Sequence, residues 1–109
     1  MSGITTHVLD TSRGRPAAGV IVTLERHDGN YWLFVGRGET DGDGRCRTLC
    51  EQPLQPSMYR LTFGTGTYFG EGHTFFPEVT IAFEVRDASQ HYHVPLLLSP
   101  YGYSTYRGS

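Results

Sequence analysis

The chain has 109 residues and a net charge of −2, and its nine basic residues are all arginines scattered along the sequence. This length predicts a single domain, residues 1–109, with a modest core. The scattered charge and the lack of a long apolar run predict neither a nucleic-acid partner nor a membrane partner. The first residues lack the basic and apolar regions of a secretory signal, and two cysteines make no disulfide framework. We therefore expect a reduced, cytoplasmic protein.

Short alternating segments separated by turn residues predict an all-β protein. The expected strands, in chain order, cover residues 4–9, 20–25, 31–36, 45–49, 58–63, 78–86, 91–98 and 103–107. Turn clusters such as 10–16 and 41–44 separate them. The glycine-rich segment 64–73 has room for at most one short helix. Eight short strands at this spacing predict a sandwich of two sheets.

The last pair of expected strands has two different faces. Alternate residues from Tyr92 to Leu98 are apolar or aromatic and suit a core, whereas the other face carries His91, His93, Pro95 and Leu97. Such a mixed face is typical of solvent exposure, or of a subunit interface that also lines a site. The sequence then closes on an aromatic, β-prone segment, although chain ends are usually frayed and polar. We expect this segment to be held in place.

The pair His91 and His93 has three interpretations. Both imidazoles can be plain surface groups, both can join His7 as the three ligands of a zinc ion, or one can be a general base near neutral pH. Arg45 is either a solvated charge or a clamp for an anion or a carbonyl oxygen. Cys46 and Cys50 share one face, so we expect both to be buried as small apolar groups.

Four segments of the sequence resemble conserved blocks of the transthyretin-like protein family. They are His7–Thr11 followed by Gly14–Ala17, then Thr40–Arg45, Phe75–Glu78, and His91–Ser109 with its Tyr-Arg-Gly-Ser ending. The resemblance covers the whole chain, and that ending resembles the enzyme branch of the family. It implies a transthyretin-like β-sandwich of two four-stranded sheets with at most one short helix.

The resemblance also implies a function. The enzyme branch opens the six-membered ring of 5-hydroxyisourate in urate breakdown and gives 2-oxo-4-hydroxy-4-carboxy-5-ureidoimidazoline. The family is described as metal-free, without a cofactor, and as a homotetramer (a dimer of dimers) with sites in a channel between the dimers. We therefore expect a small-molecule substrate and a second, third and fourth copy of the chain as partners.

The family's catalytic set falls on His7, Arg45, His93 and Ser109, and we expect Tyr106 to join these four residues in binding the substrate. Arginine keeps its proton at working pH, so Arg45 acts as a cationic donor, while His7 and His93 are left to move protons. Ser109 brings a hydroxyl and the chain-terminal carboxylate. Two alternatives stay open: a zinc hydrolase with His7, His91 and His93 as ligands, and a carrier that binds small molecules in the channel.

Overall fold

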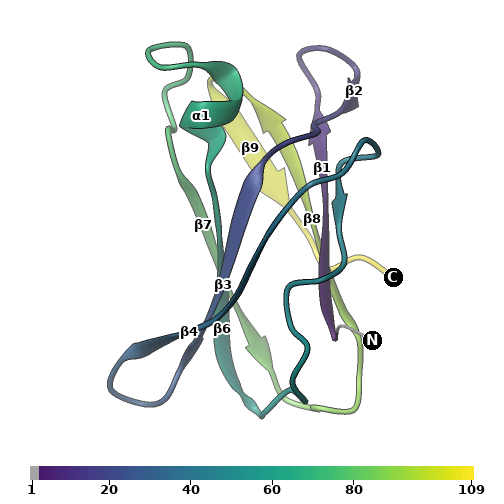
Figure 1. The fold of residues 1–109 in the computed structure, drawn as a ribbon, viewed down its shortest axis with the longest axis vertical. Coiled ribbons are helices and arrows are strands. Elements are labelled where there is room, and N and C mark those ends of the chain that lie inside the picture. The colour runs from purple at the N-terminus through teal and green to yellow at the C-terminus, as the bar shows by residue number, and fades with distance from the viewer. Residues whose placement is uncertain (1–2) are drawn as a thin grey trace.

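Two β-sheets lie face to face in the computed structural model, and a short helix closes one end between them (Figure 1). The structure describes residues 3–109. Met1 and Ser2, which belong to the segment predicted to lack a secretory signal, lie outside the described residues. No helix in the described part of the chain is long and apolar enough to cross a membrane.

The first sheet has the strand order β2-β1-β8-β9, and a fifth strand, β5, also pairs with β1. Its strands are β1 (Ile4–Asp10), β2 (Arg15–Pro16), β5 (Arg45–Cys46), β8 (Tyr92–Ser99) and β9 (Gly102–Thr105). The second sheet has the order β4-β3-β6-β7. Its strands are β3 (Ile21–His27), β4 (Trp32–Glu39), β6 (Ser57–Phe63) and β7 (Val79–Val85).

This architecture confirms the expected all-β sandwich, and the single helix α1 (Thr65–Phe69) falls inside the glycine-rich segment. Most strand bounds shift by one to three residues from the expected ones; β4 runs on to Glu39 and β9 ends at Thr105. Two further details differ. The turn cluster 10–16 folds back and adds the two-residue strand β2, which pairs with the end of β1. Strand β5 stops after Cys46, where alternation ends: Arg47 and Thr48 are both exposed, and the neighbouring Leu49 and Cys50 are both buried. Regular alternation cannot bury two neighbouring residues.

Alternation explains which side chains form the core between the sheets. In β1 the burial pattern is strictly alternating, with Ile4, Thr6, Val8 and Asp10 inside. In β8 the inward face also includes the residues predicted for it, Tyr92 to Leu98 in steps of two. Cys46 and Cys50 are buried free thiols, as expected. Burial raises the pKa of the Cys46 thiol and favours its neutral form.

The buried carboxylate Asp10 joins the helix to the first sheet. Tyr68 of α1 donates its hydroxyl proton to Asp10 Oδ2 at 2.7 Å, and Ser12 donates from its backbone N–H and its hydroxyl to Asp10 Oδ1. Burial alone raises the pKa of Asp10, but these donors, with the N–H of Arg13, outweigh it and lower the pKa. The ionised carboxylate is therefore the form that the fold holds.

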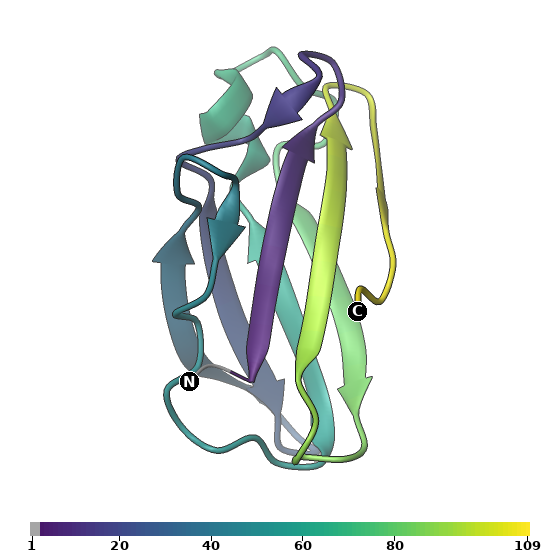
Figure 2. The same cartoon turned by 90° about the vertical axis from the view of Figure 1, so that its right-hand side faces the viewer.

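The pairing of β1 brings distant segments together. Strand β1 runs parallel to β8, with Thr5 opposite His93 and His7 opposite Pro95. On its other side it runs antiparallel to β5, with His7 opposite Arg45. In Figure 2, β1 and β8 lie side by side along the face that is turned to the viewer. Three segments far apart in sequence therefore meet across one strand.

Candidate active site

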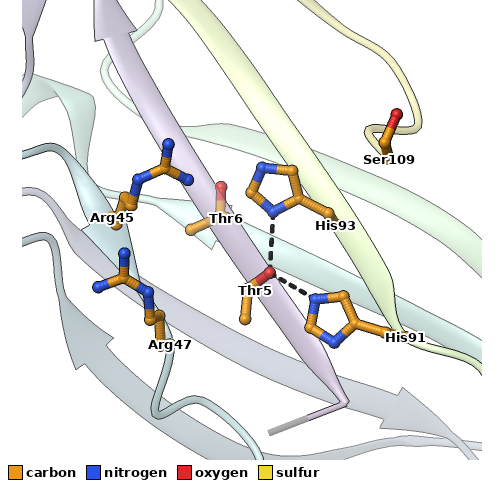
Figure 3. Close-up of a pocket in the computed structure, with 7 residues that line it drawn as sticks. All are labelled: Thr5, Thr6, Arg45, Arg47, His91, His93 and Ser109. Carbon is orange, nitrogen blue, oxygen red and sulfur yellow. Dashed lines mark hydrogen bonds between the residues drawn. The ribbon is translucent and has the colours of Figure 1, made fainter.

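A pocket of about 340 Å³ opens on the outer face of the first sheet, where β1, β5 and β8 meet. Every residue that lines it is of a polar or charged type, and several side chains are cationic or titratable (Figure 3). The residues are Thr5, Thr6, Arg45, Arg47, His91, His93 and Ser109. Three of the four residues expected to be catalytic, Arg45, His93 and Ser109, thus share one pocket.

His93 lies in β8 with its ring on the pocket side of the sheet. Its Nδ1 is 2.8 Å from the Thr5 hydroxyl oxygen, and the same oxygen is 2.9 Å from His91 Nε2. The ring therefore has one nitrogen fixed by Thr5 and the other, Nε2, on the side that faces Arg45 (Figure 3). A ring held in this way presents one nitrogen to a ligand in the pocket.

Charge and burial set the protonation of His93. Burial lowers its pKa from the ordinary value, and the nearby charges of Arg45, His7 and His91 lower it further. Desolvation and neighbouring positive charge both disfavour an imidazolium ion. His93 is therefore held as a neutral imidazole, the form that can accept a proton.

Arg45 is placed by the tight turn that precedes it. The Asp41 carboxylate accepts hydrogen bonds from the backbone N–H groups of Asp43 and Arg45, at 2.9 and 3.0 Å. These bonds lower the pKa of Asp41. Gly44 has a φ of +77°, and a Cβ there would lie 2.4 Å from the Val8 carbonyl oxygen. Only glycine fits this close approach, and the turn delivers Arg45 directly opposite His7.

His7 lies beside the pocket, next to Arg45, although it is not among the residues that line it. Its Nε2 is 2.9 Å from the Asp43 carbonyl oxygen. A carbonyl oxygen only accepts hydrogen bonds, so His7 Nε2 carries a proton and donates it. In the neutral ring, Nδ1 is then the nitrogen with a free lone pair.

The C-terminal segment folds back onto β8, and this holds Ser109 at the pocket. The Gly108 N–H donates to the His93 carbonyl oxygen at 2.8 Å. The Arg107 guanidinium lies over the Tyr92 ring, 4.6 Å from its centroid, and donates to Gln90 Oε1 at 2.9 Å. The segment is thus anchored, as expected from its sequence.

Gly108 fits against the His93 ring with no room to spare. A Cβ at this position would lie 2.5 Å from His93 Cδ2 and 3.2 Å from Pro95 Cγ. Glycine therefore lets the backbone press against the ring and restrict its position.

Tyr106 lies apart from the other predicted site residues. Its side chain is 57% exposed and lines a neighbouring pocket with residues of β7, β8 and β9. That pocket shares only His93 with the one that holds Arg45 and Ser109. A single copy of the chain thus brings four of the five expected site residues together and leaves Tyr106 at an adjoining surface.

The zinc hypothesis needs three side chains that converge on one point. Among residues 3–109, no three His, Cys, Asp or Glu side chains come together in a way that could hold a metal ion. His91 and His93 instead share Thr5, and His7 is bonded to a backbone carbonyl. The donor set of this chain therefore does not fit a three-histidine zinc site.

Sequence reasoning missed three residues of the pocket, Thr5, Thr6 and Arg47. Thr5 is 88 residues away from His93 in sequence, and only the parallel pairing of β1 with β8 brings them together. The sequence gives a partial signal for Arg47, because alternation places it on the same side of the strand as Arg45, two residues before it. The Arg47 guanidinium nitrogen Nη1 lies 3.6 Å from Asp41 Oδ2. The pocket thus carries a second cation near its rim.

Comparisons with known proteins agree on one family. The family model described as Transthyretin, HIUase/Transthyretin family, matches residues 4–108. The chain is 49% identical over 109 residues to a 5-hydroxyisourate hydrolase of Salmonella dublin, a match that covers 97% of this chain and 80% of that protein.

Two solved structures have the same fold. The 5-hydroxyisourate hydrolase of Klebsiella pneumoniae matches with a TM-score of 0.84 at 38% identity, over 97% of this chain and 98% of that chain. Sea bream transthyretin in complex with thyroxine matches with a TM-score of 0.89 at 27% identity, over 97% and 94%.

Proposed function

Because this chain belongs to the HIUase/transthyretin family, we propose that it is a hydrolase that opens the ring of 5-hydroxyisourate in urate breakdown. The relatives at high identity and coverage carry that activity in their names. The observation that carries the proposal to named residues is the single pocket shared by Arg45, His93 and Ser109, with His7 beside it. Hydrolysis of a cyclic amide needs an activated water, a donor for the developing oxyanion and a proton for the leaving nitrogen.

His93 is the proposed general base. It is held neutral beside Arg45, and its Nε2 takes a proton from the attacking water. The oxygen of that water forms a bond to the ring carbonyl carbon. His7, with its Nε2–H held by Asp43, accepts the second hydrogen of the water at Nδ1 and orients it.

Arg45 is the proposed oxyanion donor. Charge develops on the carbonyl oxygen as the water attacks, and a guanidinium that never loses its proton stabilises that charge. The bond between the carbonyl carbon and the ring nitrogen then breaks, the nitrogen receives a proton from His93, and the new carboxyl group ionises. Ser109 contributes a hydroxyl that orients the substrate, and Tyr106 is the outermost member of the proposed binding set.

The alternatives receive less support. The carrier hypothesis finds a fold partner in transthyretin, but it gives no reason for Arg45 and a histidine of lowered pKa to meet in one pocket. The donor set does not fit the zinc hydrolase, and we propose a reaction that needs no metal.

We also propose a homotetramer, a dimer of dimers, in the cytoplasm. Strands β7 and β9 end their sheets with no further partner among the described residues, and Tyr103 and Tyr106 near β9 are 42% and 57% exposed. Open edges with exposed aromatic residues favour association with another copy. The two free thiols, Cys46 and Cys50, are in keeping with a reducing compartment.

The residue assignment is tested by three alanine variants, compared with one further pocket histidine, His91, and one control histidine, His73. We expect His7→Ala, Arg45→Ala and His93→Ala each to lower the rate of 5-hydroxyisourate hydrolysis by about two or more orders of magnitude, as for lost acid–base or oxyanion groups. His91→Ala should cost much less, and the exposed His73→Ala should cost nothing. Near-normal turnover in folded His93→Ala would remove it from the proposed role.

A further inference from the structure

The Thr5 hydroxyl stands between two histidines in a way that links their protonation. Its oxygen is 2.8 Å from His93 Nδ1 and 2.9 Å from His91 Nε2 (Figure 3). A hydroxyl has one proton to donate and can accept from other donors. The Thr5 proton can go to only one of the two ring nitrogens, and the other ring nitrogen bonds to Thr5 only by carrying a proton and donating it. The two imidazoles hold opposite roles whenever the Thr5 proton points to one of them.

The surroundings select one of the two directions. His93 Nε2 lies on the side of its ring that faces the Arg45 cation, and a lone pair is favoured over an N–H group there. His93 Nδ1 then carries the proton and donates to Thr5, and the Thr5 hydroxyl donates to His91 Nε2. This direction leaves Nε2 free to accept a proton from water.

We propose that Thr5 and His91 are positioning residues that form a proton relay with His93. The proposal deepens the proposed function and rests on it. Thr5 sets the resting tautomer of His93, and His91, which is exposed, connects the chain to solvent.

The relay balances proton by proton in two steps. When His93 Nε2 takes a proton from the attacking water, the His93 Nδ1 proton passes to Thr5, the Thr5 proton passes to His91 Nε2, and His91 Nδ1 releases its proton to solvent. When His93 Nε2 gives its proton to the leaving nitrogen, every transfer runs backwards and His91 Nδ1 takes a proton from solvent. No lasting imidazolium forms beside Arg45, where burial and positive charge oppose it.

The relay lies among charges of both signs. Around His93, the titratable and charged groups on the pocket side are His7 on β1, Arg45 and Arg47 in and after β5, His91, and Ser109 with its chain-terminal carboxylate. On the adjoining side they are Glu84, Tyr92, Tyr106 and Arg107. Exposed His91 is the member of the Thr5 chain that can exchange protons with solvent.

The direct test is the tautomer of His93 in the free protein, read by ¹⁵N NMR of the histidine rings at pH 8. We expect wild type to hold the proton on Nδ1. In His91→Ala the Thr5 proton loses its acceptor and turns to His93 Nδ1, so the population shifts toward the Nε2–H form. Thr5→Ser should match wild type, and Thr5→Val should leave a mixture. An unchanged His93 tautomer in both His91→Ala and Thr5→Val would overturn the relay.

Kinetics supply a second readout. We expect Thr5→Val to lower kcat by about tenfold, with KM unchanged and Thr5→Ser restoring kcat. This loss is smaller than the roughly hundredfold or greater contribution of a general acid or base, because Thr5 acts through His93. His91→Ala should lower kcat by a similar factor in dilute buffer, and imidazole buffer should restore kcat. The matched control is Thr62→Val, the same change on the outer face of the other sheet. A higher KM with unchanged kcat in Thr5→Val would contradict the relay. A wild-type protein that does not hydrolyse the substrate would contradict the proposed function and leave the NMR result standing.

Discussion

At the scale of single residues, the site depends on groups whose state is set by their neighbours. His93 is an ordinary histidine by sequence, but burial and the charges of Arg45 and His7 lower its pKa. His7 has its tautomer fixed by the Asp43 carbonyl. Sequence identified both histidines and Arg45, since the resemblance named them, but it held no information on which imidazole stays neutral. That information comes from burial and from contacts across strands.

The lowered pKa of His93 gives a first residue-scale prediction. A cation beside the ring disfavours protonation, so removal of the cation should raise the pKa of His93. As the pH is lowered, the ring should then become protonated at a higher pH than in wild type. We expect NMR titration to show this upward shift in Arg45→Gln. Arg37→Gln, on a strand of the other sheet, should leave the titration of His93 unchanged. A downward shift in Arg45→Gln would contradict the electrostatic argument.

Gly108 gives a second residue-scale prediction. An added Cβ would lie 2.5 Å from His93 Cδ2, so Gly108→Ala should displace the ring and lower turnover by about ten- to a hundredfold, as for misplaced catalytic groups. The melting temperature should stay nearly constant. Gly102→Ala is the matched control, because a Cβ at this position would lie 3.8 Å from its nearest neighbour, Ser99 Oγ. Full activity in Gly108→Ala would show that the ring tolerates the displacement.

At the scale of elements, the strands and the helix were predictable because alternation and glycine content are local signals. Their pairing was not, because nothing local specifies that β1 runs parallel to β8. Thr5 was missed for this reason, because only the pairing of β1 with β8 brings its hydroxyl to His93. The shortness of β5 has a similar origin, since the inward turn of Leu49 and Cys50 fills a core that only the folded sheets define.

The link between α1 and β1 gives an element-scale prediction. Tyr68→Phe removes one donor to the buried carboxylate of Asp10, which should lower the free energy of unfolding by about 1 kcal/mol. The pKa of Asp10 is lowered in the folded state, so its contribution is present above its unfolded value of about 3.9 and is lost as pH falls through the folded value.

Without the Tyr68 donor the folded pKa rises, and acid destabilisation should begin at higher pH. Denaturant unfolding at several pH values measures both effects. The control is Tyr31→Phe, at a side chain that is 72% exposed. Equal acid sensitivity of Tyr68→Phe and wild type would show that this hydrogen bond does not hold the carboxylate in its ionised form.

At the scale of the whole molecule, the fold and the family were predictable from sequence because the conserved blocks span the chain. The assembly is a further step, since it depends on which surfaces of one copy meet another. Sheet edges β7 and β9 are open among the described residues, and Tyr106 lines a pocket beside them instead of the one with Arg45. We therefore expect sedimentation at micromolar concentration to show a tetramer. A monomer with full activity would refute a site shared between copies.

The proposed activity is the hydrolysis of 5-hydroxyisourate by this chain's own side chains. The most direct measurement generates 5-hydroxyisourate from urate with urate oxidase, adds chelator-treated protein and follows the decay of substrate absorbance. We expect decay far faster than the spontaneous reaction, at the same rate before and after chelation. Decay at the spontaneous rate would contradict the proposed activity, and activity lost on chelation and restored by zinc would contradict the metal-free site.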